Sequence, residues 1–350
     1  MNIAHEWFDG CDAGSFATCL AGVEEKYRTR LESGSQILIF LESPSNPFGY
    51  VMDLPAICKT AHRHGWLVLH DATVGTPFLI KPLRREDKRE RPDYVIHSYT
   101  KDLTGNGNAT AGVVIGENHR MFLPKGETER GISWEQTLFW SVYYIKGAFL
   151  DADKAFEVIS GMKTLEQRML RKCINTLVLV RALDKHPLIQ VNANAVSGHP
   201  NGAVRERVMY LGLPAPLFTI DFSRAKIARE TFVRFFDNLS PGLDHQVSLG
   251  QSNTVCLCPA LTSHSEMSEE ALKEAGITTT TIRIAVGLEN PKEILAHLRH
   301  ALALTVDQEN PGFSDRFLSD EETDHLVQET YLDVHRRFVE DGPKMATLMQ

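Results

Sequence analysis

The sequence predicts an α/β fold with a mainly parallel sheet, helices on both faces of that sheet, and a smaller C-terminal α/β domain. Short apolar runs at 36–42, 66–71, 93–98 and 111–116 are typical of buried strands. A helical pattern separates the first two runs, and alternation of strand and helix favours a parallel sheet. The 350 residues and apolar fraction of 43% allow a large core and more than one domain.

The first run, QILIFLE, is apolar almost throughout, so we expect a strand covered on both faces. The turn SPSNPFG follows. Asp53 is placed to cap a helix through about His64, and Gly65 suits the position after its end. WLVLHD, DYVIHS and AGVVIG then supply the next three strands.

The second half of the chain begins with a helical stretch over 150–185, which has no proline before Pro187. Apolar strands are predicted at 217–222 and 280–287, and a helix at 291–304 starts on a proline. We therefore predict three parts. These are a large domain with a long linking helix (1–185), a small α/β domain (186–306) and a charged helical tail (307–350).

Bulk properties exclude several classes of protein. The net charge of −8, with no basic stripe, argues against a nucleic-acid partner. No apolar run approaches the ~18 residues that a membrane helix needs, and the N-terminus does not resemble a signal peptide. Of the six cysteines only Cys256 and Cys258 are close, and their spacing is too short for a metal or redox motif. We expect reduced thiols, no metal, and a cytoplasmic protein.

Polar side chains follow three of the predicted strands, at 42–46, 71–73 and 98–101. Because ligands bind outside the carboxyl ends of parallel strands, these clusters predict a site at one edge of the sheet. Lys101 belongs to the third cluster. Taken alone, it is a surface charge, a phosphate-binding group or a nucleophilic amine.

An aldehyde cofactor would give these residue types complementary roles. A lysine amine condenses with pyridoxal phosphate, and Asp71 suits the pyridine nitrogen of that cofactor. Ser98 and Thr100 can donate to its phosphate. Arg283 lies in an apolar strand and is a candidate to bind the carboxylate of an amino acid. Each residue alone also has an ordinary explanation as a turn residue, surface charge or structural ion pair. Their occurrence together favours the site.

The sequence resembles the Cys/Met-metabolism family of pyridoxal-phosphate enzymes, which includes cystathionine γ-synthase, cystathionine lyases, methionine γ-lyase and homoserine sulfhydrylases. The matching stretches, between about residues 8 and 306, are ESPSNP, HDATVGTP, HSYTK, GMKTLEQRM, SLG, PALTSH and IRIAVGLEN. The resemblance implies an aspartate-aminotransferase-like fold (fold type I) and pyridoxal 5'-phosphate as cofactor. It also implies a homo-oligomer, dimer or tetramer, with active sites at the interface of a dimer.

The resemblance also implies roles for individual residues. It identifies Lys101 as the Schiff-base lysine. The implied cofactor-binding residues are Asp71 at the pyridine nitrogen, Ser98 and Thr100 at the phosphate, Thr73, and Asn46 near the phenolic oxygen. The implied substrate-carboxylate site is made by Arg283, Ser248 and Asn46.

The sequence departs from the family at several points. Ala72 stands where the family has asparagine, Asp102 where an aromatic residue is common, and Asn253 where glutamate often occurs. We also expect that the family's N-terminal segment is missing. That segment carries a glycine-containing phosphate loop and the aromatic residue that stacks on the cofactor.

Two functions follow from the resemblance. The first is a transsulfuration-type enzyme that acts on sulfur amino acids or homoserine esters, by γ-replacement or γ/β-elimination through a Lys101 aldimine. The alternative is a non-catalytic or split-subunit remnant that binds the cofactor weakly and needs a partner chain for the missing segment. The leaving group, the acceptor thiol and the choice between β and γ chemistry are open at this point.

Overall fold

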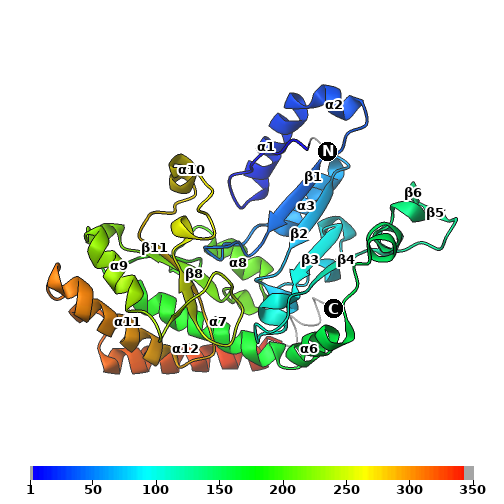
Figure 1. Cartoon of the computed structure of the whole chain (residues 1–350). Helices are drawn as coiled ribbons and strands as arrows, with labels where there is room; N and C mark the ends of the chain where they lie inside the picture. Colours follow the sequence, from blue (N-terminus) through cyan, green and yellow to red (C-terminus); the bar gives the residue numbers. More distant parts are fainter. Residues whose placement is uncertain (1–2, 343–350) are drawn as a thin grey trace.

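A computed structural model, which describes residues 3–342, shows two main sheets arranged along the length of the molecule (Figure 1). The first has the order β1-β2-β3-β4, with β1, β2 and β3 parallel and β4 antiparallel. Its strands are β1 (Leu38–Glu42), β2 (Leu67–Asp71), β3 (Tyr94–Ser98) and β4 (Gly112–Gly116). All four lie within the predicted runs.

Strand β1 is covered on one face only. Ile39 and Leu41 are buried in the same core as residues of α3 (Leu54–Arg63), whereas Leu38 and Phe40 are 55% and 59% exposed. The expectation that this strand is covered on both faces is therefore wrong, because α3 packs against only one of them.

Helix α3 begins where the sequence predicts, but Asp53 does not cap it with its side chain. The Asp53 carboxylate instead accepts a hydrogen bond from Arg207 at 2.6 Å. This contact ties the first turn of α3 to the distant helix α8 (Gly202–Val208).

The other elements of the N-terminal half surround the first sheet. They are α1 (Ala13–Lys26), α2 (Arg28–Glu32), α4 (Thr76–Leu79), α5 (Asn118–Met121), β5 (Thr128–Glu129) and β6 (Ile132–Ser133). The β5–β6 hairpin sits on an arm that projects from the body of the molecule (Figure 1).

The predicted helical stretch at 150–185 is two helices, α6 (Ala152–Met162) and α7 (Leu165–Leu183). Near the end of α6, a Cβ at Gly161 would lie 2.4 Å from the Thr104 carbonyl oxygen, so this position has room only for glycine. Helix α7 contributes buried residues to both hydrophobic cores, and so connects the two sheets.

The second sheet has the order β7-β8-β11-β10-β9 and is mainly antiparallel. Its strands are β7 (Gln190–Asn192), β8 (Leu217–Asp221), β9 (Asp244–His245), β10 (Val255–Leu257) and β11 (Thr281–Ala285). Helices α9 (Arg229–Asp237), α10 (Glu269–Glu274) and α11 (Pro291–Thr305) accompany it. Every residue of β8 and β11 is buried.

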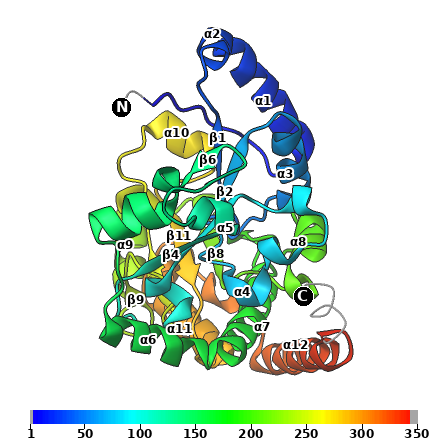
Figure 2. The ribbon, with the colours of Figure 1, turned by 90° about the vertical axis from the view of Figure 1, so that its right-hand side faces the viewer.

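Helix α12 (Asp320–Glu340) packs along α7 at the bottom of the molecule (Figures 1 and 2). The Tyr331 hydroxyl donates to Asn175 Oδ1 at 2.6 Å, and Val334 is buried. Of the predicted tail, residues 343–350 lie outside the described residues. The domain boundaries at 185 and 306 remain predictions.

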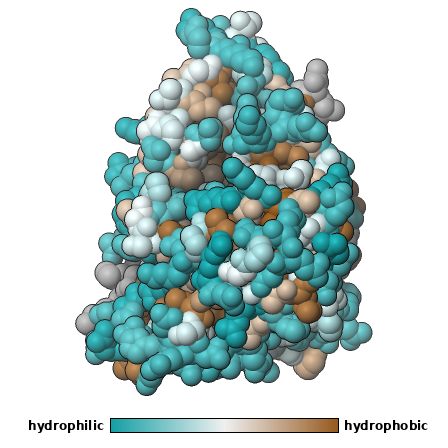
Figure 3. Space-filling model, turned by 90° about the vertical axis from the view of Figure 1, so that its left-hand side faces the viewer, coloured by the Kyte–Doolittle hydropathy of each residue, from teal (hydrophilic) through white to brown (hydrophobic). Residues whose placement is uncertain are grey.

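The described surface is mostly polar. On the face in Figure 3, apolar residues form small patches within a largely hydrophilic surface. None of the helices within residues 3–342 is long and apolar enough to cross a membrane. All six cysteines are free, and four of them are buried.

Candidate active site

The carboxyl ends of β1, β2 and β3 meet at one edge of the first sheet, as predicted. Glu42 is paired with Asp71 in the register of β1 and β2. Asp71 Oδ1 accepts from the Thr73 amide at 2.9 Å, and the Thr73 hydroxyl accepts from the Ser98 amide at 2.9 Å. Within residues 3–342, Oδ2 of Asp71 accepts no hydrogen bond. One oxygen of this carboxylate is therefore available to an N–H donor.

Glu42 is electrostatically coupled to this cluster. Burial, together with the nearby Asp71 carboxylate, raises the pKa of Glu42 to about 7. Its Oε1 accepts from the backbone amide of Asn46 at 3.3 Å, which ties the middle of the SPSNPFG turn to the end of β1. A carboxyl group that titrates near neutrality at a sheet edge is typical of functional sites.

Lys101 lies in the turn Tyr99–Leu103, directly after β3, and its own backbone is non-helical (φ −90°, ψ −139°). Its Nζ donates to Ser248 Oγ at 2.8 Å. Partial burial, and then the nearby Arg283 cation, lower the pKa of Lys101. A larger fraction of this amine is therefore neutral and nucleophilic near pH 7 than for an exposed lysine.

Arg283, on β11, reaches the same place from the second sheet. It is 1% exposed, and it donates to Asn46 Oδ1 at 3.2 Å and to the carbonyls of Val247 and Ser248 at 3.0 and 2.8 Å. Burial lowers the pKa of Arg283 to about 10. Within residues 3–342 it forms no ion pair, and its Nε is buried without a hydrogen-bond partner. Among the described residues, neutral amide and carbonyl oxygens are therefore the only groups that bind this guanidinium.

Ser248 connects the two cations. Its side chain accepts from Lys101 and its carbonyl accepts from Arg283. One chain of hydrogen-bonded residues therefore runs from Lys101 through Ser248 and Arg283 to Asn46. Its longest step, from Arg283 to Asn46, joins residues that are 237 positions apart in the sequence.

Thr100 has a different environment. Its hydroxyl accepts from the Ala111 amide at 3.2 Å and lies 3.5 Å from the Ala111 carbonyl, so it fastens the turn to the residue before β4. The phosphate-binding roles of Ser98 and Thr100 remain predictions.

A buried ion pair beside Lys101 was not predicted from the sequence. Lys172 on α7 donates to Asp102 Oδ1 at 2.7 Å, and these side chains are 0% and 1% exposed. The only signal in the sequence was the departure at Asp102. Lys172 itself falls in the helical pattern of α7, where a lysine is usually exposed.

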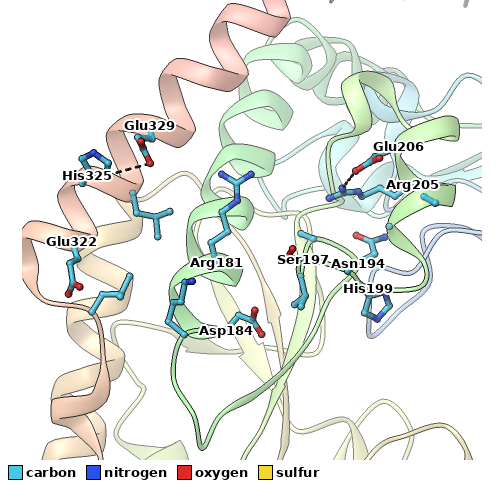
Figure 4. Close-up of a pocket in the computed structure, with 18 of the residues that line it drawn as sticks. Arg181, Asp184, Asn194, Ser197, His199, Arg205, Glu206, Glu322, His325 and Glu329 are labelled. Carbon is cyan, nitrogen blue, oxygen red and sulfur yellow. Dashed lines mark hydrogen bonds and ion pairs between the residues drawn. The ribbon is translucent and has the colours of Figure 1, made fainter.

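A cavity elsewhere in the molecule contains none of the predicted site residues. It has a volume of about 1050 Å³ and lies between α7, the segment 194–206 and α12 (Figure 4). Its lining mixes Arg181 and Arg205 with Asp184, Glu206 and Glu329, and it is separate from Lys101.

Comparison with known proteins identifies the family. Residues 21–303 match the family described as Cys/Met metabolism PLP-dependent enzyme. The chain belongs to this family. Members of this family use pyridoxal phosphate as their cofactor, so the resemblance drawn from the motifs is confirmed.

Named relatives in this family are enzymes of sulfur amino-acid metabolism. L-Methionine gamma-lyase of Fusobacterium nucleatum subsp. polymorphum is 33% identical over 268 residues, which cover 76% of this chain and 62% of the relative. O-Succinylhomoserine sulfhydrylase of Pseudomonas aeruginosa is 31% identical over 267 residues, 76% of this chain and 60% of the relative. The chain thus spans about three fifths of the length of the curated relatives that it matches.

Solved structures of the family confirm the predicted fold class. The crystal structure of cystathionine gamma lyase from Micromonospora echinospora matches with a TM-score of 0.64 and 26% identity, over 79% of this chain and 66% of that one. Cystathionine gamma synthase from Xanthomonas oryzae pv. oryzae matches with a TM-score of 0.66 and 24% identity, over 83% and 72%. The likeness to the synthase concerns the fold alone.

Proposed function

We propose that this chain is a pyridoxal-phosphate-dependent enzyme of the transsulfuration type, with sulfur amino acids or homoserine esters as substrates. The observation that carries the proposal is the hydrogen-bonded chain from Lys101 through Ser248 to Arg283 and Asn46. It joins a nucleophilic amine to a guanidinium that can bind an anion. An aldehyde cofactor and an amino-acid carboxylate require these two groups side by side.

The donor set fits the cofactor. Lys101 supplies the amine, and the Asp71 carboxylate offers Oδ2 to a protonated ring nitrogen. Ser98 and Thr73 stand beside Asp71 at the same edge of the sheet. When bound there, pyridoxal phosphate would supply an electron sink that stabilises negative charge on the amino acid.

The residues of this chain would then have separate roles in substrate binding and proton transfer. Arg283, with Asn46, would bind the α-carboxylate and thereby orient the Cα–H bond of the substrate. Lys101 Nζ would take and return protons on the substrate carbons, since its lowered pKa brings proton exchange closer to neutral pH. The Ser248 hydroxyl would hold that amine in place between transfers.

We further propose a homo-oligomer in the cytoplasm. Large apolar side chains are exposed between residues 143 and 162, among them Ile145, Phe149 and Phe156, which are 73%, 62% and 67% exposed. A second copy of this chain would bury these apolar side chains in a subunit interface. The six free cysteines suit a reducing compartment.

Borohydride trapping tests the proposal. The full chain is mixed with pyridoxal 5'-phosphate, reduced, digested and mapped by mass spectrometry. The label should appear on Lys101 and be lost in Lys101→Ala, but it should persist in the surface control Lys292→Ala. Elimination of thiol from methionine should fall ~10²–10⁴-fold in Lys101→Ala, the usual contribution of a positioned general base. Labelling of another lysine, or none at saturating cofactor, would refute the proposal.

A further inference from the structure

The ion pair of Asp102 and Lys172 lies one residue from Lys101. Lys172 Nζ donates to Asp102 Oδ1 at 2.7 Å and to the Gln251 carbonyl at 2.5 Å. Lys172 belongs to α7, Asp102 to the turn that carries Lys101, and Gln251 to the loop that carries Ser248. One buried ammonium therefore holds three separate segments together.

The loop with Ser248 also packs directly on the lysine turn. Gly250 has φ +85°, and a Cβ there would lie 2.5 Å from the Asp102 amide nitrogen and 2.9 Å from Lys101 Cα. The two backbones can approach this closely only because residue 250 is glycine. The Gln251 carbonyl, one residue later, is the atom that Lys172 holds.

We propose that Lys172 is a positioning residue. Through the Asp102 carboxylate and the Gln251 carbonyl, it fixes the backbone of Lys101 against the loop of Ser248. The contact between Lys101 Nζ and Ser248 Oγ depends on that arrangement. This inference deepens the proposed function and rests on it.

Packing alone does not require a charged pair at this position. Two apolar side chains of similar volume fill a buried site at least as well, because burying two ions costs desolvation that their attraction only partly offsets. The family resemblance points the same way, since an aromatic residue is common where Asp102 stands. What apolar residues cannot supply is a donor to the Gln251 carbonyl or a negative charge beside Lys101.

The charge of Asp102 acts on the lysine itself. Its carboxylate favours the protonated form of Lys101 and opposes the effects of burial and of Arg283. The Lys172 ammonium donates to that same buried carboxylate. The pair therefore influences both the position and the protonation of the amine.

The test uses the full chain and the double variant Asp102→Leu/Lys172→Met, which replaces the pair with apolar residues of similar size and should fold. Lys172→Met is the single variant. Asp221→Asn is the matched control, since Asp221 is a buried carboxylate beside the other core. It accepts from hydroxyl groups and from the Ser223 amide, and it forms no ion pair within residues 3–342. Thermal unfolding monitors the fold of each protein.

Two readouts follow. Without cofactor, the rate at which acetic anhydride labels Lys101 is measured against pH by peptide mass spectrometry. With pyridoxal 5'-phosphate, the rate of borohydride-trappable attachment to Lys101 is measured. In the double variant the apparent pKa of Lys101 should fall, and attachment should slow ~10- to 100-fold, as expected for a displaced reacting group. Asp221→Asn should match the wild type in both readouts.

A folded double variant with the wild-type labelling profile and attachment rate would overturn the inference. The single variant serves as a second check. Lys172→Met leaves Asp102 without its partner, so wild-type behaviour there would also overturn it. Absence of attachment in the wild type would refute the proposed function instead. The labelling profile needs no cofactor and would still decide the role of the pair.

Discussion

The two sheets are buried to different extents, and each contributes a different kind of group to the candidate site. In the second sheet every residue of β8 and β11 is buried, whereas in the first sheet β1 alternates between buried and exposed residues. The first sheet contributes titratable groups at its edge, among them Asp71 and Lys101. The second sheet contributes Arg283, a cation whose hydrogen-bond partners include the carbonyls of Val247 and Ser248.

This difference has a physical reason. A strand covered on both faces has no water to solvate a charge, so a charge there needs protein partners in fixed positions. Arg283 has such partners, and the result is a preorganised site for an anion. At the sheet edge, partial exposure allows proton exchange, which the chemistry of an amino group needs.

The largest expected effect compares the core of the second sheet with the exposed face of β1. Phe235 in the second core is fully buried and lies 5.0 Å, ring centroid to centroid, from Phe222. Phe235→Ala should lower the free energy of unfolding by about 3–5 kcal/mol, whereas Phe40→Ala on the open face of β1 should change it by less than about 0.5 kcal/mol. Urea denaturation measures both. A cost above about 1 kcal/mol for Phe40→Ala would show that this face is covered in solution.

The second prediction concerns acid sensitivity at the first sheet. His70 on β2 is fully buried, its Nε2 donates to the Ser43 carbonyl at 2.8 Å, and its Nδ1 has no partner among the described residues. Burial lowers the pKa of His70 to about 4. The unfolded chain therefore takes up this proton first as the pH falls.

The contribution of His70 to stability should be complete above pH ~6.5 and should decline as the pH falls toward 4, by about 3 kcal/mol in total. Urea denaturation at several pH values measures this loss. In His70→Gln the loss over the same range should be smaller by about that amount. Parallel curves for the two proteins would contradict the assignment.

The third prediction tests whether Arg283 of the second sheet binds the amino-acid carboxylate. Arg283→Lys keeps the charge but removes the planar fork, so amino-acid binding should weaken by ~1.5–3 kcal/mol while cofactor binding changes little. Calorimetric titration of the loaded protein measures the amino-acid affinity. Arg336→Lys, at an exposed position on α12, is the control. Unaltered affinity in Arg283→Lys would remove this residue from the site.

The smallest expected effect has the opposite pH dependence to that of His70. The hydrogen bond from His62 to Asp93, at 3.2 Å, raises the pKa of His62. Its contribution to stability should be complete below pH ~6.5 and be lost as the pH rises through the raised value. The difference in unfolding free energy between wild type and His62→Gln should therefore shrink from pH 6 to pH 8. Equal differences at pH 6 and pH 8 would contradict the prediction.

Much of the fold could be predicted because its signals are local. The apolar runs at 36–42, 66–71, 93–98 and 280–287 all contain strands, since a short apolar run between turn residues has few alternatives. The break between α6 and α7 was missed because the two residues between these helices, Lys163 and Thr164, are neither proline nor glycine. The exposed face of β1 was missed because coverage of a strand depends on its neighbours.

The candidate site also has features that the sequence determined and features that only the tertiary structure decided. The sequence by itself determined which residue types stand at the strand ends, and through its motifs the family, because these depend on the order of residues along the chain. Tertiary structure alone decided that Ser248 links Lys101 to Arg283, that Thr100 turns to Ala111, and that Asp102 meets Lys172. Each of these contacts crosses between elements, and the free energy of a buried polar contact depends on partners that sequence spacing does not specify.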